Sequence, residues 1–596
     1  MEKRAVLAFV LIIMIWIGYY YFVIPMYVPT SEPVFTEGSG NPNDISSQPN
    51  NNTSPNNTFP PVDPPVKSFR EARVNEGGEN VSPFSSDQIP TRIDQNRNRV
   101  ADSWDRSEQV TFLFSAPSDE NPQDVLIESE YFRGIISTQG ANITSWQLKK
   151  YRGIDAPWVE LIPQGREYGP DIILTSEEGP YSLQNVMFDS NRDRLNLSES
   201  KKQGTLVFTG TTQNGLTITK QYTFNNDNYA FEIKVGMNGG GNLPLGSKYY
   251  LRWGGGIRVT EQDASQDLLA FRGFAQLGDT FIDEDGLGTE IEDPRAETTG
   301  ELLWTGVRSK YFLAAFIPQD NPGKGYRLNG RPVNTGEIQD RQISAEISMT
   351  LSSSINDKFL IYLGPVHYET LESYGFGLEN AVDLGWSIIS PVSKITLSML
   401  VWLHQFISNY GIVIIILSVF VKIILFPLTY KSMKATQGMQ QIQPQMEALR
   451  EKHKNDSQKL NKEMMKLYKE GGVNPLGGCL PMVLQMPILF SLYTVFSSTI
   501  ELRDAPFIDA WINDLSLKDP IYVLPVLMGL TMLLQSKMTM KDPRQAMFIY
   551  VMPIVLFFIM KDLPSGLILY WTMVNILTII QQYIQNRFLP ISPATT

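Results

Sequence analysis

One lysine lies inside an apolar run that is otherwise long enough to cross a membrane. From Gly411 to Leu428, Lys422 is the only strongly polar residue. An ammonium group in lipid costs roughly 3 kcal/mol or more, so such a residue usually faces water or a polar partner. The alternative is that its four-carbon stem carries the amine to the inner interface. The run therefore predicts a membrane helix with either a hydrated polar site or a snorkelling lysine.

The composition argues against several classes of protein. The chain has 596 residues and a formal net charge of −12, so we expect at least two domains and no DNA partner. It has one cysteine, Cys479, so no intrachain disulfide can form. The three histidines are far apart in the sequence and show no metal-ligand spacing. We therefore predict neither a metal site nor a cofactor.

The amino-terminal segment has the pattern of an uncleaved transmembrane anchor, which we place at residues 1–28. Lys3 and Arg4 precede a run from Ala5 to Ile24 that contains no charge. A signal peptide has a shorter apolar region and a small-residue cleavage site, and neither is present. The two basic residues place this end in the cytoplasm. Residues 29–108 are rich in Asn, Pro, Ser and Gly, which predicts a disordered periplasmic linker.

Residues 109–382 change to short runs of branched and aromatic residues between Gly, Asn, Asp and Pro turns. The runs are Val125–Glu130, Gly204–Thr211, Leu216–Phe224, Ala230–Val235, Phe312–Ile317 and Phe359–Leu363. Such spacing predicts a large β-sandwich of mostly antiparallel strands. Its acidic and aromatic residues are compatible with a sugar-binding cleft, but no nucleophile, metal cluster or phosphate-binding loop stands out. We therefore predict that the protein is not an enzyme.

Residues 383–408 are apolar but interrupted by small polar side chains. These recur at intervals of three and four residues, at Ser387, Ser390, Ser393, Lys394 and Ser398. The pattern predicts an amphipathic helix that lies along the outer membrane surface. A second full span is the competing interpretation, and both the polar stripe and Pro391 disfavour it.

The lysine-containing span, placed at residues 409–430, is followed by a basic segment at 431–473. Nine lysine and arginine residues lie between Lys431 and Gly472, which assigns this segment to the cytoplasm. Apolar residues at helical spacing predict a helical hairpin. It is either a solvated coiled hairpin or a docking arm for a ribosome, a targeting receptor or lipid headgroups. The candidate docking residues are Lys434, Arg450, Lys452, Lys454, Lys459 and Lys462.

Four further apolar runs complete six predicted spans with both chain ends in the cytoplasm. They cover residues 474–500, 521–536, 546–561 and 566–586. An acidic periplasmic loop (501–520), a basic cytoplasmic loop (537–545), a periplasmic turn (562–565) and a short cytoplasmic tail (587–596) connect or end them. The runs at 521–536 and 546–561 are shorter than an average bilayer core, which predicts a thinned membrane or an incompletely spanning pair.

Polar residues in the spans share helical faces. Trp571, Asn575, Thr578 and Gln582 line the last span, Thr531 and Gln535 share a face on an earlier one, and Ser491, Thr494 and Ser498 share another. Ser418 lies one turn from Lys422. Such residues commonly join helices by hydrogen bonds. Together with an intramembrane cation, however, they favour a hydrated groove lined from several helices.

Several long motifs resemble the YidC, Oxa and Alb family of membrane protein insertases. They are IILFPLTYKSM, NPLGGCLPMVLQMPILFSLY, ELRDAPFIDAWINDLSLKDP, LPVLMGLTM and LPSGLILYWTMVNILTIIQQ, in the family's order, within about residues 384–587. The resemblance implies five helices around a hydrophilic groove that is open to the cytoplasm and lipid and closed toward the periplasm. The anchor and the β domain resemble Gram-negative members, which have a periplasmic β-supersandwich and lie in the inner membrane.

The resemblance also implies which residues line the groove. Gln535 and Trp571 match groove positions of the family, and Lys422 stands where the family usually has arginine. The charge remains, but the planar fork that holds a carboxylate through two hydrogen bonds is lost. The full predicted groove set is Lys422, Ser418, Gln485, Thr531, Gln535, Trp571, Asn575 and Thr578.

The predicted function is insertion and folding of inner-membrane proteins without nucleotide hydrolysis, either alone or with the Sec translocon. The expected partners are hydrophobic nascent membrane proteins, Sec components, the ribosome, the receptor of the signal recognition particle, and lipids. One rival is a secondary transporter or channel for a small anion; such proteins tend to have repeated halves, and none is evident here. The other rival is a periplasmic binding or scaffold protein with a simple membrane anchor.

Overall fold

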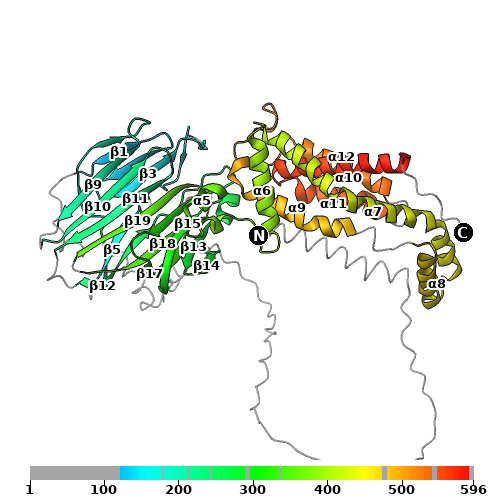
Figure 1. The fold of residues 1–596 in the computed structure, drawn as a ribbon, viewed down its shortest axis with the longest axis horizontal. Coiled ribbons are helices and arrows are strands. Elements are labelled where there is room, and N and C mark those ends of the chain that lie inside the picture. Colours follow the sequence, from blue (N-terminus) through cyan, green and yellow to red (C-terminus); the bar gives the residue numbers. More distant parts are fainter. Residues whose placement is uncertain are drawn as a thin grey trace, which may run out of the picture.

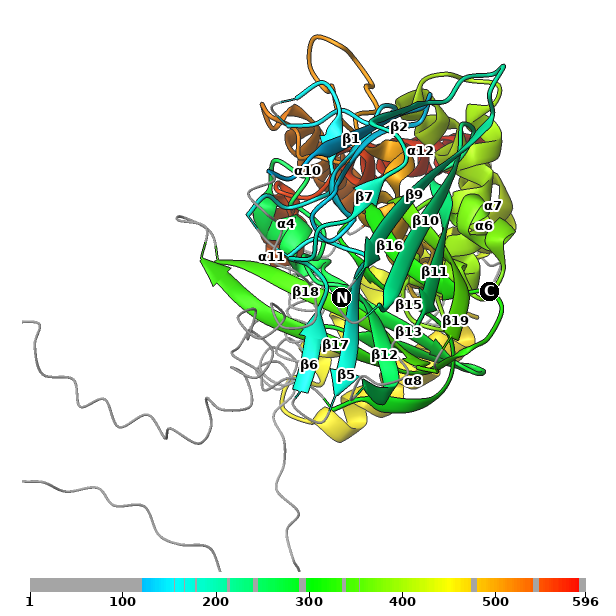
Figure 2. The same cartoon turned by 90° about the vertical axis from the view of Figure 1, so that its left-hand side faces the viewer.

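The computed structural model describes residues 121–588, except for short segments. These segments are residues 155, 166, 177–178, 212–214, 240–244, 289–295, 335–338, 353, 473–479 and 540–545. The predicted anchor (1–28) and linker (29–108) lie outside the described residues. Figure 1 shows a β domain beside a helical part, and Figure 2, turned by 90°, places the β domain in front of the helices.

The β domain contains two sheets in the part of the chain that is described. The smaller has the order β4-β3-β2-β1-β8, with β1 (Asp124–Glu128), β2 (Phe132–Ser137), β3 (Asn142–Leu148), β4 (Val159–Glu160) and β8 (Arg194–Asn196). The larger has 14 described strands in the order β6-β5-β12-β18-β17-β15-β16-β19-β11-β10-β9-β7, and the β13–β14 hairpin pairs with β15.

The bounds of the larger sheet's strands are as follows. They are β5 (Asp171–Ser176), β6 (Gly179–Ser182), β7 (Asp189–Ser190), β9 (Gln203–Thr211), β10 (Thr217–Asn225), β11 (Ala230–Asn238), β12 (Leu245–Trp253), β13 (Arg272–Leu277), β14 (Thr280–Glu284), β15 (Thr298–Arg308), β16 (Phe312–Pro318), β17 (Gly323–Asn334), β18 (Gln339–Thr350) and β19 (Ser354–Pro365). Each of the six runs that the sequence predicted as strands overlaps one of β1, β9, β10, β11, β16 and β19, and none extends more than two residues beyond its strand. Among the described pairs only β1 with β8 is parallel.

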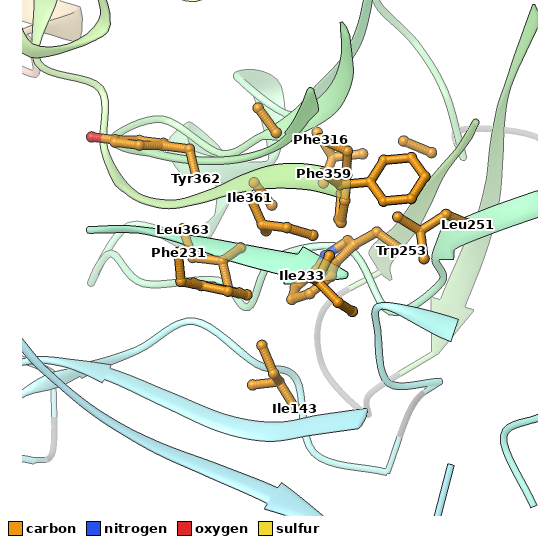
Figure 3. Close-up of a cluster of buried hydrophobic side chains, with 14 of the residues drawn as sticks. Ile143, Phe231, Ile233, Leu251, Trp253, Phe316, Phe359, Ile361, Tyr362 and Leu363 are labelled. Atoms are coloured by element: carbon orange, nitrogen blue, oxygen red, sulfur yellow. The ribbon is translucent and has the colours of Figure 1, made fainter. Parts of the chain in front are cut away.

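The two sheets share one hydrophobic core. Side chains of β10 alternate between buried and half-buried positions, as period-two strands require. Figure 3 shows Phe231 and Ile233 of β11 near Ile361 of β19, with Ile143 of the smaller sheet on the other side. Burial of each large apolar side chain contributes about 1.5–3 kcal/mol, so this shared core is what holds the sheets together.

A lysine occupies one core-facing position of β10. Lys220 is fully buried between Ile218 and Tyr222 in the alternating pattern. Its Nζ donates three hydrogen bonds, to Gly140 O at 2.7 Å, Asn142 Oδ1 at 2.8 Å and Pro170 O at 2.7 Å. An ammonium group has three donors, so each of them has an acceptor. Lys220 therefore ties β10 to segments that lie far away in the sequence.

The helical part begins with short elements and continues as longer helices, which are mostly apolar except for the lysine-rich α8. They are α5 (Tyr368–Tyr374), η3 (Leu378–Ala381), α6 (Ser390–His404), α7 (Tyr410–Lys452), α8 (Ser457–Glu470), α9 (Leu480–Ser498), η5 (Ile500–Leu502), α10 (Val523–Thr539), α11 (Ala546–Met560) and α12 (Ser565–Phe588); α4 (Ala264–Leu269) belongs to the β domain. By length and composition α7 and α12 can cross a membrane, and α10 and α11 are shorter apolar helices.

Helix α7 does not end where the sequence suggested a boundary between span and hairpin, near residue 430. It continues for 43 residues, from a cap at Asn409, whose side chain accepts from the Ile412 N–H at 3.1 Å, to Lys452. Pro427 and Pro444 lie inside it without ending it. The predicted hairpin thus consists of the carboxy-terminal half of α7 together with α8. Asp456 caps α8 by accepting from the Lys459 N–H at 3.0 Å.

Helix α6 divides its polar residues differently from the predicted single polar stripe. Ser393 is fully buried, whereas Ser387, Lys394 and Ser398 of the predicted stripe are exposed. Thr396, which was not part of the predicted stripe, has its Oγ1 3.3 Å from Ser491 Oγ of α9. Ile395 and Trp402 are instead 62% and 57% exposed. Small side chains allow close helix contact, whereas the large apolar ones remain available to lipid.

Candidate functional site

Lys422 of α7 points its amine at α12. Its Nζ donates to Thr578 Oγ1 at 2.8 Å, and the Thr578 hydroxyl in turn donates to Val574 O at 2.6 Å within its own helix. Both side chains are half-buried. The contact gives the amine a polar partner inside the helical part, which agrees with the groove hypothesis. A snorkelling lysine would instead direct its amine to the membrane interface.

A second polar contact lies about one turn before Thr578 in α12, toward the start of the helix. Asn575 is 5% exposed, and its Nδ2 donates to Thr531 Oγ1 of α10 at 3.4 Å. Thr531 also donates back to Leu527 O at 2.9 Å. This pair joins two helices, which is the common use of polar residues in a membrane. The polar face of α12 thus meets α7 at one position and α10 at another.

The other predicted groove residues are not joined to Lys422 by a described contact. Ser418 is fully buried and donates to Ile414 O at 2.7 Å, one turn back in its own helix. Gln485 of α9 and Gln535 of α10 are half-buried. Trp571 is half-buried and packs against the apolar core of the helical part. The structure therefore unites Lys422 with Thr578, and Asn575 with Thr531, as two separate pairs.

A cavity of about 320 Å³ lies beside Lys422, between α7 and α12. Most of its walls are aliphatic or aromatic, and its lining residues are Val419, Lys422, Ile423, Phe426, Tyr430, Leu577, Ile580, Gln581, Ile584 and Gln585. Gln535, Trp571 and Asn575 do not line it. The cavity is thus built from two helices, rather than from the several that the sequence led us to expect for a hydrated groove.

The cavity contains two polar residues that the sequence analysis missed. Gln581 and Gln585 are 9% and 4% exposed, and Gln581 Nε2 donates to Thr429 Oγ1 of α7 at 3.1 Å. They stand three and seven residues after Thr578, which is one helical face. That spacing was visible in the sequence and extends the polar edge of α12 toward its end.

The loop between η5 and α10 closes the ends of α7 and α12 that lie opposite the hairpin. Asn409 Nδ2 donates to Phe507 O at 3.0 Å, and the Gly566 N–H donates to Leu515 O at 3.0 Å. Gly411 has no room for a side chain, because a Cβ atom there would lie 2.0 Å from the Phe507 ring. We call residues 503–522 the cap loop.

At the other end, the hairpin presents most of its basic residues to solvent. Arg450 is half-buried, whereas the remaining candidates are exposed, namely Lys434, Lys452, Lys454, Lys459 and Lys462. Leu460 and Met464 of α8 are buried on the opposite face. Within the described residues, no group of three or more His, Cys, Asp or Glu side chains has the arrangement of a metal site.

Two family descriptions match this chain, and together they cover both of its parts. "YidC periplasmic domain" matches residues 124–394, and "60Kd inner membrane protein" matches residues 402–592. A membrane protein insertase YidC of Geotalea uraniireducens is 36% identical over 78% of this chain and 88% of its own length. The chain belongs to the YidC family of membrane protein insertases. The resemblance found in the motifs is thereby confirmed.

Other YidC proteins show the same relationship. The YidC of Geobacter sulfurreducens is 35% identical over 76% of this chain and 84% of its own length. A solved structure described as an active YidC insertase with its first transmembrane domain resolved is 17% identical, with a TM-score of 0.35, and covers 82% of this chain and 99% of that one. The family assignment rests on the sequence relatives.

Membership of the YidC family fixes the coarse arrangement of this chain. The β domain coincides with the match to the YidC periplasmic domain, and the helical part coincides with the match to an inner membrane protein. The shared name describes insertion of membrane proteins and not conversion of a small molecule. It gives no support to the alternative of a secondary transporter or anion channel.

Proposed function

We propose that this YidC-family chain inserts hydrophobic protein segments by giving their polar ends a transient path along the seam of α7 and α12. The observation that carries the proposal is the hydrogen bond from the Lys422 amine to the Thr578 hydroxyl. This contact joins α7 and α12, and its acceptor is a neutral group. A neutral partner leaves the charge uncompensated, so an acidic group of a client gains by replacing it. No nucleotide hydrolysis is required.

Capture begins at the cytoplasmic hairpin. Its exposed basic side chains suit the acidic surfaces of lipid headgroups, ribosomal RNA and targeting receptors. We expect contact there with the ribosome, the receptor of the signal recognition particle and Sec components. Hydrophobic nascent membrane proteins are the clients, taken either from these partners or directly.

Transfer then uses the polar residues of the helical part. The client's acidic tail pairs with Lys422, and Gln535, Trp571 and Asn575 supply further hydrogen-bond donors. Thr531 and Gln485 do not line the cavity beside Lys422, and we include them in a wider groove that the client would open. Burial of the client's apolar helix in lipid provides the driving force, and release follows because lipid solvates that helix better than a polar groove does.

The proposed topology has six spans with both chain ends in the cytoplasm. Helices α10 and α11 have 17 and 15 residues. At 1.5 Å per residue they are about 26 and 23 Å long, which is less than an average hydrocarbon core. The membrane around them is therefore thinned, which lowers the barrier for a polar tail. Helix α6 lies along the outer surface, with Ile395 and Trp402 in lipid.

The test is insertion into vesicles that contain only this protein. Two matched clients are used, one with an acidic and one with a neutral outer tail. Lys422→Met is expected to slow the acidic client at least tenfold and to leave the neutral client nearly unchanged, whereas Lys422→Arg supports both. Equal insertion of both clients by Lys422→Met would overturn the role of the charge.

A further inference from the structure

The cavity between α7 and α12 is a long and narrow slot. Its lining runs from Val419 to Tyr430 on α7, which is a length of about 16 Å at 1.5 Å per residue. A volume of about 320 Å³ over that length gives an average width of only about 5 Å. An α-helix with its side chains is about 10–12 Å wide. The slot is therefore too narrow for a client helix, and it has the dimensions of a single extended alkyl chain.

The rim of the slot is apolar and exposed. Ile423 of α7 and Ile580 of α12, which line the slot, are 65% and 48% exposed. Phe426 and Tyr430 form another part of the wall, with their ring centroids 6.1 Å apart. Both helices are long and apolar enough to cross a membrane, so exposed apolar side chains on them face acyl chains. A lipid chain therefore reaches the slot from the side.

Two buried glutamines on α12 give the slot unused hydrogen-bond acceptors. The Thr429 hydroxyl accepts from Gln581 Nε2 and donates to Leu425 O at 3.1 Å in its own helix. A hydroxyl has one hydrogen, so Thr429 cannot also donate to the Gln581 amide. Among the described residues, the Oε1 atoms of Gln581 and Gln585 have no hydrogen-bond partner, although both residues line the slot. Buried acceptors of this kind require a donor from a bound molecule.

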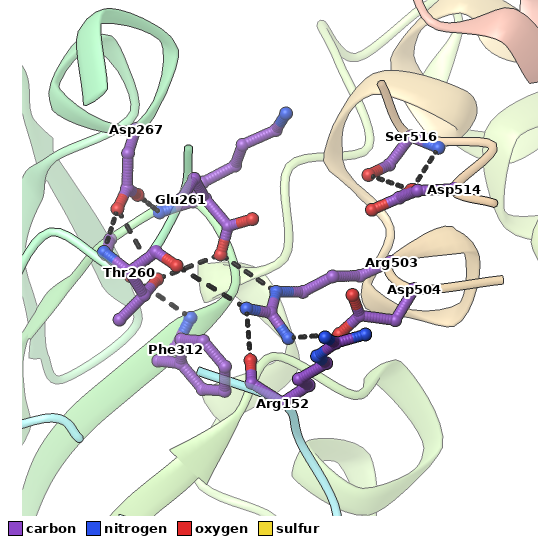
Figure 4. Close-up of polar contacts among 11 residues, drawn as sticks. Arg152, Thr260, Glu261, Asp267, Phe312, Arg503, Asp504, Asp514 and Ser516 are labelled. Atoms are coloured by element: carbon purple, nitrogen blue, oxygen red, sulfur yellow. Dashed lines mark hydrogen bonds and ion pairs between the residues drawn. The ribbon is translucent and has the colours of Figure 1, made fainter. Parts of the chain in front are cut away.

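Protein closes the opposite end of the seam between α7 and α12. The cap loop holds α7 through Asn409 and α12 through Gly566. Arg503, the buried first residue of this loop, has its Nε 2.8 Å from Glu261 Oε1 of the β domain, and its Nη2 donates to Arg152 O at 2.9 Å (Figure 4). The cap loop is thus fixed both to the helices and to the β domain. A lipid in the slot therefore comes from the leaflet on the side of the hairpin.

We propose that the slot binds one acyl chain of an ethanolamine phospholipid, and that Gln581 and Gln585 accept hydrogen bonds from its headgroup ammonium. An ammonium group has three N–H donors, whereas a choline headgroup has the same charge and no N–H. Lys434 is exposed and lies one turn beyond Tyr430 on the same face of α7, where it can pair with the lipid phosphate. The site therefore selects ethanolamine over choline lipids.

The position of Lys422 is compatible with a bound chain. Its amine is directed at Thr578, which does not line the slot, so the chain meets the methylene groups of the lysine stem rather than the charge. A client that enters the seam would displace the chain into lipid. Binding of the lipid is nevertheless independent of the proposed insertion function, because it takes place without a client.

The experiment measures lipid binding to the full-length protein by native mass spectrometry, with no client present. Protein freed of lipid in detergent is titrated with an equimolar mixture of ethanolamine and choline phospholipids that carry identical acyl chains. We expect the ethanolamine lipid to be preferred in the first bound position by at least about tenfold, because a hydrogen bond from a charged donor contributes at least that factor. Equal occupancy by the two lipids would overturn the proposal.

A double variant, Gln581→Leu with Gln585→Leu, tests the headgroup contact. Leucine is similar in size and removes both unpartnered oxygens, so the helix pair is retained. We expect the preference for the ethanolamine lipid to disappear, while the choline lipid binds as it does to wild type. The control is Gln445→Leu, which replaces an exposed glutamine of α7 outside the slot and keeps the preference. A preference that survives in the double variant would contradict the assignment.

Val419→Phe tests the place of the acyl chain. The larger side chain fills part of the slot, and loss of burial for two methylene groups already weakens binding about tenfold, so we expect both lipids to bind at least that much less tightly. Val551→Phe, at an exposed position of α11 outside the slot, is the matched control and should bind both lipids like wild type. Unchanged binding by Val419→Phe would show that the chain lies elsewhere.

Discussion

Two lysines removed from bulk water, one in each part of the molecule, have opposite environments. Lys220 in the β-domain core donates to three acceptors within 2.8 Å, two of them backbone carbonyls. Lys422 in the helical part donates to one described acceptor, the Thr578 hydroxyl. Each ammonium has three donors, so the first is saturated and the second retains donors for another group.

The difference teaches how a buried cation is used. A saturated ammonium holds its surroundings together, since every bond that it makes would be lost with it. An unsaturated ammonium next to a cavity gains from a new partner, and this is what a transient client supplies. We therefore expect Lys220 to affect stability and Lys422 to affect insertion, each with little effect on the other property.

The largest expected effect is that of Lys220→Met on the β domain. The change leaves Gly140 O, Asn142 Oδ1 and Pro170 O without their donor, at a cost of at least about 3 kcal/mol. Thermal unfolding of the full-length protein in detergent, followed by β-sheet circular dichroism, should show a clearly lower midpoint. Lys234→Met, at an exposed position of the adjacent strand β11, is the control and should change the midpoint little. A Lys220→Met midpoint equal to that of the control would refute the structural role.

The next largest effect is expected for Lys422→Met. If this variant were destabilised as strongly as Lys220→Met, the proposed difference between the two lysines would be wrong. We expect an unfolding midpoint within a few degrees of wild type, because the variant loses one hydrogen bond and no longer buries a cation. Insertion of a client with an acidic tail should fall at least tenfold, since charge-assisted hydrogen bonds contribute about 1.5–3 kcal/mol. Strong destabilisation without a selective insertion defect would make Lys422 a structural residue.

Much of the fold could be predicted from the sequence because it depends on local patterns. Alternating and apolar runs located six of the 19 described strands, and the motifs identified the family. The continuity of α7 through residue 430 was not predicted, because a change from apolar to basic composition is no helix stop signal. Lys220 was also missed: a lysine within β10 looks like a solvent-facing residue until its acceptors, 50 to 80 residues away, are known.

The site was less predictable than the fold, because sequence patterns indicate local structure and not contacts between distant segments. Lys422 was predicted because it is an isolated cation in an apolar helix. Thr578 was predicted because its spacing places it on the polar face of the last span. Which polar residues meet across helices depends on packing, and the structure pairs Asn575 with Thr531 rather than with Lys422. The contact of Arg503 with Glu261 joins residues 242 positions apart and has no local signal.

A smaller effect is expected for Lys422→Arg, which sharpens the comparison by changing the shape of the cation and not its charge. The guanidinium can hold a carboxylate through two parallel hydrogen bonds, which an ammonium cannot. We expect insertion of the acidic client at the wild-type rate or a few times faster. Competition by a client with an amide in place of the acid is the control, and it should not distinguish Lys from Arg. Loss of insertion in Lys422→Arg would show that size, and not charge, decides at this position.

The smallest effect is expected for Thr578→Val, which removes the described acceptor of the resting amine while it preserves the shape of the side chain. If the hydroxyl only holds Lys422 between clients, its loss costs about 1 kcal/mol or less, and insertion changes less than about threefold. The sign is informative: a client that no longer displaces a hydroxyl binds slightly better, so the acidic client should be inserted as fast as before or faster. Thr572→Val on the same helix is the matched control, since its buried hydroxyl donates to Ile568 O at 2.8 Å and not to another helix. If Thr578→Val reduced insertion of the acidic client as much as Lys422→Met does, the amine would act only while it is bonded to the hydroxyl. Lys422 and Thr578 would then form one site.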